Sequence, residues 1–157
     1  MHLYLPLILL PLAALAREDP PPGWGNFFGS CENIKNTNAR QENDSHFLIA
    51  TCKSSDGEIT TKLDLTKCFK NGDDATLEPE NDGNAFAVLK EGSKRECSKC
   101  NVDMRPYRLE DPKVGPVLSC ICRQGKGNMF KQGKLNQVVR NDGGYLRCFD
   151  HRGELVH

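Results

Sequence analysis

The chain has few aromatic and hydrophobic residues and no excess of charge of either sign. Only 7% of its 157 residues are aromatic, 38% are hydrophobic, and one is a tryptophan. Lysine plus arginine and aspartate plus glutamate each number 21, so the formal net charge is zero. A dedicated binder of nucleic acid or of an anionic membrane needs a basic face, and the charge balance argues against both classes. A local basic patch is still compatible with this composition.

Long apolar runs are missing except at the N-terminus. Leu3–Leu15 is almost wholly apolar but too short to span a bilayer. Ala14-Leu15-Ala16 is a small-x-small cleavage site with charged residues directly after it, so residues 1–16 are predicted to be a secretory signal. The alternative is a buried N-terminal helix, which Pro6 and Pro11 disfavour. We therefore expect a secreted, extracellular product without membrane insertion.

Segments with the periodicity of a long helix are absent too. Short alternating strands lie between turns rich in glycine, asparagine and aspartate. An example is Phe47–Lys53, followed by the hairpin pair Asp56-Gly57 and a returning strand at 58–63. Asp64 is then placed to cap a single helical turn at 65–69. The pattern predicts an all-β domain.

One unit of about seventy residues occurs twice, and this duplication decides the architecture. In each copy an upstream cysteine precedes an apolar run that ends in a second cysteine, Phe47–Cys52 in one copy and Val117–Cys122 in the other. A glycine turn, a second extended run, a leucine with polar neighbours, an asparagine turn and a final leucine follow each time. Neither copy buries much surface alone. We therefore expect the copies to share one core or to exchange strands about a pseudo-two-fold axis.

The repeats also set the boundaries of the remaining segments. The stretch between the copies contains a small apolar strand, predicted at Ala85–Leu89. The predicted divisions are a proline-rich leader at 17–25, a domain at 26–148 with repeats at about 26–78 and about 92–148, and a loose C-terminal tail at 149–157.

Two further features suit an exported chain. Asn43 begins the sequence Asn-Asp-Ser, an N-glycosylation acceptor in a polar loop. All eight cysteines follow the cleavage site, and an even count in an exported chain indicates a disulfide framework. The alternative is a zinc site, because Cys97 with Cys100 and Cys120 with Cys122 are spaced like ligand pairs. An oxidising compartment favours disulfides.

The duplicated pattern of paired cysteines, glycine turn, leucine and asparagine turn resembles the cyanovirin-N homology domain, in the cysteine-rich form of secreted fungal proteins. The resemblance covers Asn26 to about Cys148, nearly the whole mature chain. The aromatic lead-in, with Phe27 four residues before Cys31, is present only in the first copy, and Ser93 takes its place in the second.

The resemblance implies an all-β, elongated, pseudo-symmetric fold stabilised by disulfides. Each half would be a three-stranded sheet plus a β-hairpin with short 3-10 turns. Members of the family are lectins that bind mannose-rich glycans in a shallow pocket near each end, without catalysis and without a metal or other cofactor. The expected partners are therefore oligosaccharides or glycoproteins rather than nucleic acid, and the chain is expected to be a monomer or a strand-swapped dimer.

The family pattern also implies a disulfide pairing, out of the many that eight cysteines allow. It would join Cys31 to Cys52 and Cys97 to Cys122. Of the other four cysteines, Cys100 and Cys120 lie one alternation step inward and are paired with each other, which leaves Cys68 with Cys148.

The family's two sugar pockets can be carried over position by position. They fall on short polar residues at turns, where backbone amides supply rigid donors for sugar hydroxyls. The first pocket would gather Asn26, Gly29, Ser30, Lys53, Ser54, Ser55, Asn141 and Asp142. The second would gather Lys70, Asn71, Asp73, Arg95, Glu96, Arg123, Gln124, Gly125 and Lys126.

This chain departs from the family pattern at several of these positions. Lys70 and Arg95 stand where the best binders carry acids, which would collect cations and remove acceptors from the second pocket. Gly29 has no side chain where the first pocket usually has a polar one. Asn71 and Asn141 match the pattern best, although asparagine often occupies such turns for its backbone conformation alone. Between the two, the sequence slightly favours the first pocket as the sugar-binding one.

Two other functions compete with sugar binding as interpretations of the sequence. An enzyme would use His46, His151 or His157 with Asp150, but no nucleophile motif lies near them. The stronger rival is a secreted interaction protein that keeps the fold and has lost the sugar. It would offer an acidic partner the basic cluster Lys90, Lys94, Arg95, Lys99, Arg105 and Arg108.

Overall fold

The computed structural model describes residues 25–37, 46–87, 96–104 and 115–157. The predicted signal, the leader up to residue 24, Asn43 and Arg95 lie outside these ranges. The regular structure of the described chain consists almost entirely of antiparallel strands, which confirms the all-β prediction. Among these residues no helix has the length and apolar character needed to cross a membrane.

The first repeat forms an antiparallel sheet around a long hairpin. Its strands are β1 (Cys31–Asn36), β2 (Phe47–Ser54) and β3 (Gly57–Asp64), and β12 (Glu154–Leu155) is added at the β3 edge. The hairpin turn joins Ser54 to Gly57 as predicted from the Asp-Gly pair. Asp64 then caps the short helix η2 (Leu65–Lys67), since its carboxylate accepts a 2.9 Å hydrogen bond from the Thr66 amide.

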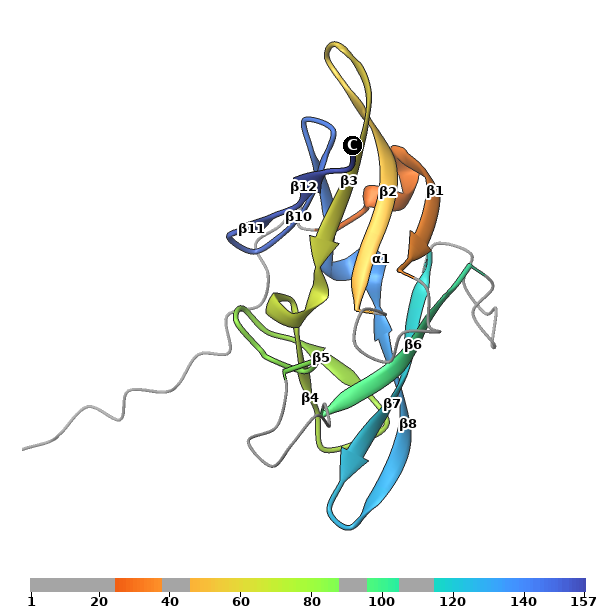
Figure 1. Ribbon diagram of the computed structural model, residues 1–157, viewed down its shortest axis with the longest axis vertical. Helices are drawn as coiled ribbons and strands as arrows, with labels where there is room; N and C mark the ends of the chain where they lie inside the picture. The colour runs from red at the N-terminus through yellow and green to blue at the C-terminus, as the bar shows by residue number, and fades with distance from the viewer. Residues whose placement is uncertain (1–24, 38–45, 88–95, 105–114) are drawn as a thin grey trace, which may run out of the picture.

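The second repeat forms the matching sheet in the other half of the molecule. Its strands are β6 (Cys97–Asp103), β7 (Val117–Gln124) and β8 (Gly127–Lys134). The strand registers are equivalent, because Cys31 lies opposite Cys52 in one sheet and Cys97 opposite Cys122 in the other. Figure 1 shows an elongated molecule with the β2–β3 and β7–β8 hairpin turns at opposite ends.

Each repeat continues into a small hairpin that packs on the other repeat. The hairpins are β4 (Phe69–Asn71) with β5 (Leu77–Pro79), and β9 (Arg140–Asp142) with β10 (Tyr145–Cys148). The first lies against β8 and the second against β2 and β3 (Figure 1). Both arrangements offered by the sequence are present, since the hairpins are exchanged between the halves and one core cluster contains residues of both repeats.

The core leaves space for the side chains of the exchanged hairpins. The Phe69 ring enters the second half at Gly133, where an added Cβ would lie 3.0 Å from Cε1 of the ring. The equivalent positions of the other half carry Leu63 and Val139, so a leucine–valine pair replaces the glycine–phenylalanine pair. Phe69, Leu63 and Val139 are buried. A large side chain beside glycine in one half, and two medium ones in the other, keep both halves densely packed.

Four disulfides stabilise the fold, in the pairs that the family resemblance implies. Three join neighbouring strands within one sheet, and all eight cysteines are used, which leaves none for zinc. The fourth joins the end of η2 to β10 and so connects the two repeats. The pairs are Cys31–Cys52, Cys97–Cys122, Cys100–Cys120 and Cys68–Cys148.

Two local predictions differ from the structure. The tail at 149–157 is not loose, because β11 (His151–Arg152) pairs with β10 and β12 pairs with β3. The expected strand at Ala85–Leu89 is absent from its described part, where Ala85 and Phe86 are buried in a turn. The turn after β8 is a single helical turn, α1 (Leu135–Val138), whose first and last residues are buried.

The two halves meet where β1 approaches β6. The Asn36 side chain bridges them, since its Nδ2 donates to the Cys100 carbonyl at 2.7 Å and its Oδ1 accepts from the Val102 amide at 3.1 Å. A hollow of about 580 Å³ lies beside this bridge and contains none of the predicted sugar residues. Its lining is Ile34, Lys35, Asn36, Thr37, Ile49, Asn101 and Val102.

Candidate functional site

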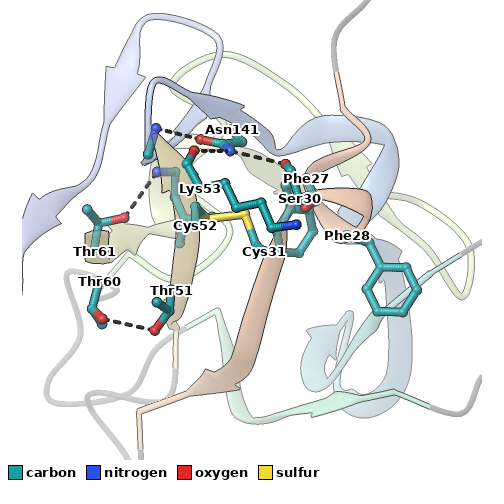
Figure 2. The surroundings of a disulfide bond; sticks show 12 residues. Phe27, Phe28, Ser30, Cys31, Thr51, Cys52, Lys53, Thr60, Thr61 and Asn141 are labelled. Carbon is teal, nitrogen blue, oxygen red and sulfur yellow. Dashed lines mark hydrogen bonds between the residues drawn. A yellow bond between two sulfur atoms is a disulfide. The ribbon is translucent and has the colours of Figure 1, made fainter. Parts of the chain in front are cut away.

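The first predicted pocket is organised around Asn141, the central residue of β9. Its Nδ2 donates to the Lys53 carbonyl at 2.8 Å and to Ser30 Oγ at 3.1 Å, while its Oδ1 accepts from the Gly144 amide at 2.7 Å. Figure 2 shows Asn141 between Lys53 and Ser30, next to the Cys31–Cys52 disulfide. One side chain therefore fixes three segments that are far apart in the sequence.

Around this centre the β2–β3 turn and the 141–144 turn lie in contact. An added Cβ at Gly144 would lie 2.8 Å from both Ser54 Cβ and Ile59 Cδ1, so only glycine permits this approach. The Ser54 hydroxyl donates to the Gly57 carbonyl at 2.9 Å within its own turn. Ser55 is exposed at the tip of that turn. The hairpin turn and the sugar-pocket interpretations of this stretch are thus compatible.

The remaining residues of the first pocket lie at its rim. Asn26 and Gly29 are exposed at either end of η1 (Phe27–Gly29), and Asn26 adopts a left-handed conformation with φ 64°. Asp142 is held by Arg147, whose Nη1 lies 2.9 Å from Asp142 Oδ2. This hydrogen bond lowers the pKa of Asp142 below its ordinary value, against the opposing effect of partial burial. The carboxylate therefore stays charged through the mildly acidic range.

The second predicted pocket repeats the same construction around Asn71, at the end of β4. Its Nδ2 donates to the Arg123 carbonyl at 2.9 Å and to Glu96 Oε1 at 3.0 Å. Glu96 thus occupies the place of Ser30, and Arg123 the place of Lys53. Unlike its counterpart, the buried Asn71 Oδ1 has no hydrogen-bond partner among the residues that the structure describes. The second tip is therefore less completely bonded than the first.

Lys70 does not contribute a free cation to the second pocket, contrary to the expectation from the sequence. It lies opposite Glu78 in the β4–β5 hairpin, and its Nζ is 3.2 Å from Glu78 Oε2 and 2.8 Å from Glu80 Oε2. Hydrogen bonds to Glu80 and Glu78 raise the pKa of Lys70 above its ordinary value. The positive charge of Lys70 is therefore offset by two neighbouring carboxylates.

The other residues of the second pocket surround the β7–β8 turn. Gln124 donates its side-chain amide to the Asp73 carbonyl and so attaches the β4–β5 loop to the turn. Arg123, Gly125 and Lys126 are exposed. In the adjacent core the buried Lys131 donates to the Gly72 carbonyl. Hydrogen bonds therefore bring together Asn71, Asp73, Glu96, Arg123 and Gln124, whereas the Lys70 side chain is held by Glu78 and Glu80.

Several residues that shape the two tips were not found from the sequence. Gly144 and Arg147 support the first, and Glu78, Glu80 and Lys131 support the second. A charge pattern was present, since Lys70 and Glu78 have opposite signs, but it identifies a pair only after the hairpin register is known. Because both asparagine side chains bond within the fold, the polar groups open to a ligand at each tip belong to their exposed neighbours.

The histidines considered for catalysis lie at different places and have different partners. His46 is buried beside Phe86, and its Nε2 is 3.6 Å from Asp64. His151 lies 3.2 Å from Asp82, in the turn after β5. Among the described residues no three His, Cys, Asp or Glu side chains gather in a metal-binding group. The arrangement at each tip is one of fixed amides, hydroxyls and charges, which suits recognition of a polyhydroxylated ligand.

Comparisons with known proteins add the following findings. The model of the family described as "CVNH domain" matches residues 27–147. A search of the curated proteins gave no match. Among solved structures, this chain is similar to the crystal structure of a MoCVNH3 variant (Mo0v) in complex with (N-GlcNAc)4. That similarity has a TM-score of 0.49 and 20% sequence identity and covers 80% of this chain and 97% of the other.

Proposed function

Since the match over residues 27–147 shows that this chain belongs to the CVNH domain family, a family of carbohydrate-binding lectins, we propose that it is a secreted lectin for mannose-type glycans. The supporting observation is the duplicated asparagine centre. Asn141 and Asn71 each fix a turn of one repeat against the hairpin of the other, and exposed polar groups surround both.

Rigid turns favour sugar binding for an energetic reason. A saccharide presents many hydroxyls, and each loses water on binding, so donors and acceptors must already be in place to compensate. At the first tip Lys53 and Ser55 are exposed on the turn that Asn141 holds. At the second, Arg123 and Lys126 are exposed on the turn that Asn71 holds through the Arg123 carbonyl. Both tips therefore have the preorganised polar surface that a shallow sugar pocket needs.

A glycan array followed by calorimetric titration tests the proposal. The mature chain is expected to bind oligomannosides with micromolar to millimolar dissociation constants and to be competed by free mannose. The variants Ser55→Ala and Lys126→Ala report on the two tips without removing a fixed centre, since both residues are exposed at turns. (N-GlcNAc)4 serves as a comparison ligand of different chemistry.

The outcome against the proposal is equally definite. A folded protein that binds no mannoside would show that the chain has kept the fold without this ligand. Binding of (N-GlcNAc)4 alone would leave a lectin but remove the mannose assignment. Binding that neither turn variant alters would place the site away from both tips.

A further inference from the structure

An apolar pair lies uncovered on the outer face of the second sheet. Ile121 on β7 and Phe130 on β8 are directly opposite each other, and their side chains are 39% and 59% exposed. An exposed phenylalanine does not gain the free energy of burial, and only 7% of the residues in this chain are aromatic. Neither side chain supports the core, because Leu118, Cys120 and Cys122, the buried residues around Ile121 on β7, point to the opposite face.

The first repeat shows that the fold does not require this pair. The equivalent positions are Thr51 and Thr60, which are also opposite each other. Their hydroxyls lie 2.9 Å apart in a hydrogen bond, as Figure 2 shows. A sheet of the same register is therefore built with two polar residues in one half and with two exposed apolar residues in the other. The difference points to a role on the surface.

The pair adjoins the second candidate pocket. Side chains two residues apart on a strand share a face and lie about 7 Å apart. Arg123 and Asn128, the next opposite pair on this face, lie toward the β7–β8 turn and are both exposed. On the other side Gln132 donates to the Ser119 hydroxyl at 3.2 Å. The apolar pair is thus a small island between polar groups that continues the sugar-binding tip along the sheet.

The size of the island decides between possible occupants. A stable protein partner needs about 800 Å² on each side, with several buried anchors. Two partly exposed side chains surrounded by polar groups supply far less than this. They match one ring with an apolar face and polar edges. A pyranose has this character, since its ring hydrogens form an apolar patch and its hydroxyls project from the rim.

We propose that Phe130 and Ile121 form an accessory sugar subsite on the second half of the molecule. A ring of an oligosaccharide held at the β7–β8 tip stacks on Phe130, while Arg123 and Asn128 lie within reach of its hydroxyls. This inference rests on the proposed lectin function and extends it. The first half has no equivalent subsite, because threonines occupy both positions. The two tips should therefore differ in the length of glycan that they prefer.

The test compares Phe130→Thr with Met129→Thr. Phe130→Thr installs the residue of the first repeat at an exposed position. Met129 is a matched control, because it is the adjacent residue, is 38% exposed and points to the opposite face. Titration with a tetrasaccharide and with the monosaccharide bound by the wild type should show about a three- to tenfold weaker tetrasaccharide affinity for Phe130→Thr. Monosaccharide affinity, and both affinities of Met129→Thr, should stay at the wild-type level.

Other outcomes separate this inference from the proposed function. If the wild type binds no glycan, the proposed function fails and the subsite fails with it. If the wild type binds but Phe130→Thr leaves tetrasaccharide affinity unchanged, only the subsite is wrong. Sedimentation of the wild type should show a monomer at binding concentrations. A dimer that Phe130→Thr dissociates would assign the face to a second copy of the chain and overturn the subsite.

Discussion

At the level of single residues, the two tips are held by side-chain amides that bond across the repeats. Asn141 uses both ends of its amide, with three partners at 2.7 to 3.1 Å. Asn71 uses only its Nδ2, with two partners at 2.9 and 3.0 Å. A hydrogen bond in a partly buried site contributes about 1 kcal/mol, and an orphaned partner adds a further cost. The two asparagines should therefore differ in their contribution to stability.

Replacement of each asparagine by alanine tests this difference. Asn141→Ala should lower the free energy of unfolding by about 2 kcal/mol and Asn71→Ala by about 1 kcal/mol. Asn128→Ala, at an exposed position, should change it by less than about 0.5 kcal/mol. Urea unfolding at neutral pH measures all three. An equal loss for the two asparagines would show that the Gly144 amide bond contributes nothing.

The ion pair between Asp142 and Arg147 at the first tip should make the stability of the protein depend on pH. The Arg147 hydrogen bond lowers the pKa of Asp142 below the ordinary 3.8, so the folded state binds this proton less readily than the unfolded state. Its contribution is therefore fully present above pH 3.8 and is lost as the pH falls through the lowered value. Asp142→Asn should flatten the stability profile below pH 3.8, as measured by thermal unfolding between pH 5 and 2. An unchanged slope would contradict the ion pair.

At the level of elements, the C-terminal segment is part of the first sheet. Glu154 lies opposite Lys62 and Leu155 opposite Thr61, and the Gly153 amide donates to the Leu146 carbonyl at 2.8 Å. A Cβ added at Gly153 would lie 3.0 Å from the Lys62 carbonyl oxygen, so a larger residue there would press on β3. The segment therefore covers the β3 edge, which an uncapped sheet would expose.

Truncation tests the contribution of this segment. A chain that ends at Phe149 loses β11 and β12 and should unfold at a melting temperature lower by several degrees. A chain that ends at Leu155 keeps both strands and loses only the 3.1 Å bond from the Val156 amide to the Thr60 carbonyl, so it should melt close to the full chain. Differential scanning calorimetry gives both values. Equal melting temperatures for all three chains would restore the loose-tail prediction.

At the level of the whole molecule, the Cys68–Cys148 disulfide joins the two repeats, whose hairpins already pack on each other. Cys68 and Cys148 are 80 residues apart, whereas Cys31 and Cys52 are 21 apart within one sheet. In the chain-entropy model the longer loop contributes about 4.5 kcal/mol and the shorter about 3.3 kcal/mol. The connection between the repeats should therefore be the more stabilising of the two.

Paired replacement by alanine measures this difference. Removal of Cys68 with Cys148 should lower the free energy of unfolding more than removal of Cys31 with Cys52, by about 1 kcal/mol. Guanidinium unfolding without reductant gives both values. The opposite order would mean that local packing at β1 and β2, rather than loop closure, dominates the contribution of these disulfides.

The sequence by itself determined the duplicated plan. Alternating runs that end in cysteine, the Asp-Gly turn and the Asp64 cap are local signals, and a local signal is preserved wherever the segment packs. The family resemblance added the cysteine pairs, and the same duplication placed Asn71 and Asn141 at equivalent turns. These features needed no knowledge of which strand lies beside which.

Only the tertiary structure decided the features that depend on contacts between distant segments. The pairing of β12 with β3, the acids around Lys70 and the space for Phe69 at Gly133 each join residues whose proximity no local pattern encodes. The exposure of Phe130 is of the same kind, because an apolar residue on a strand is assigned to the core until the sheet shows which face is covered. Strand register and hairpin exchange are collective outcomes of packing, and they determine which side chains reach the surface.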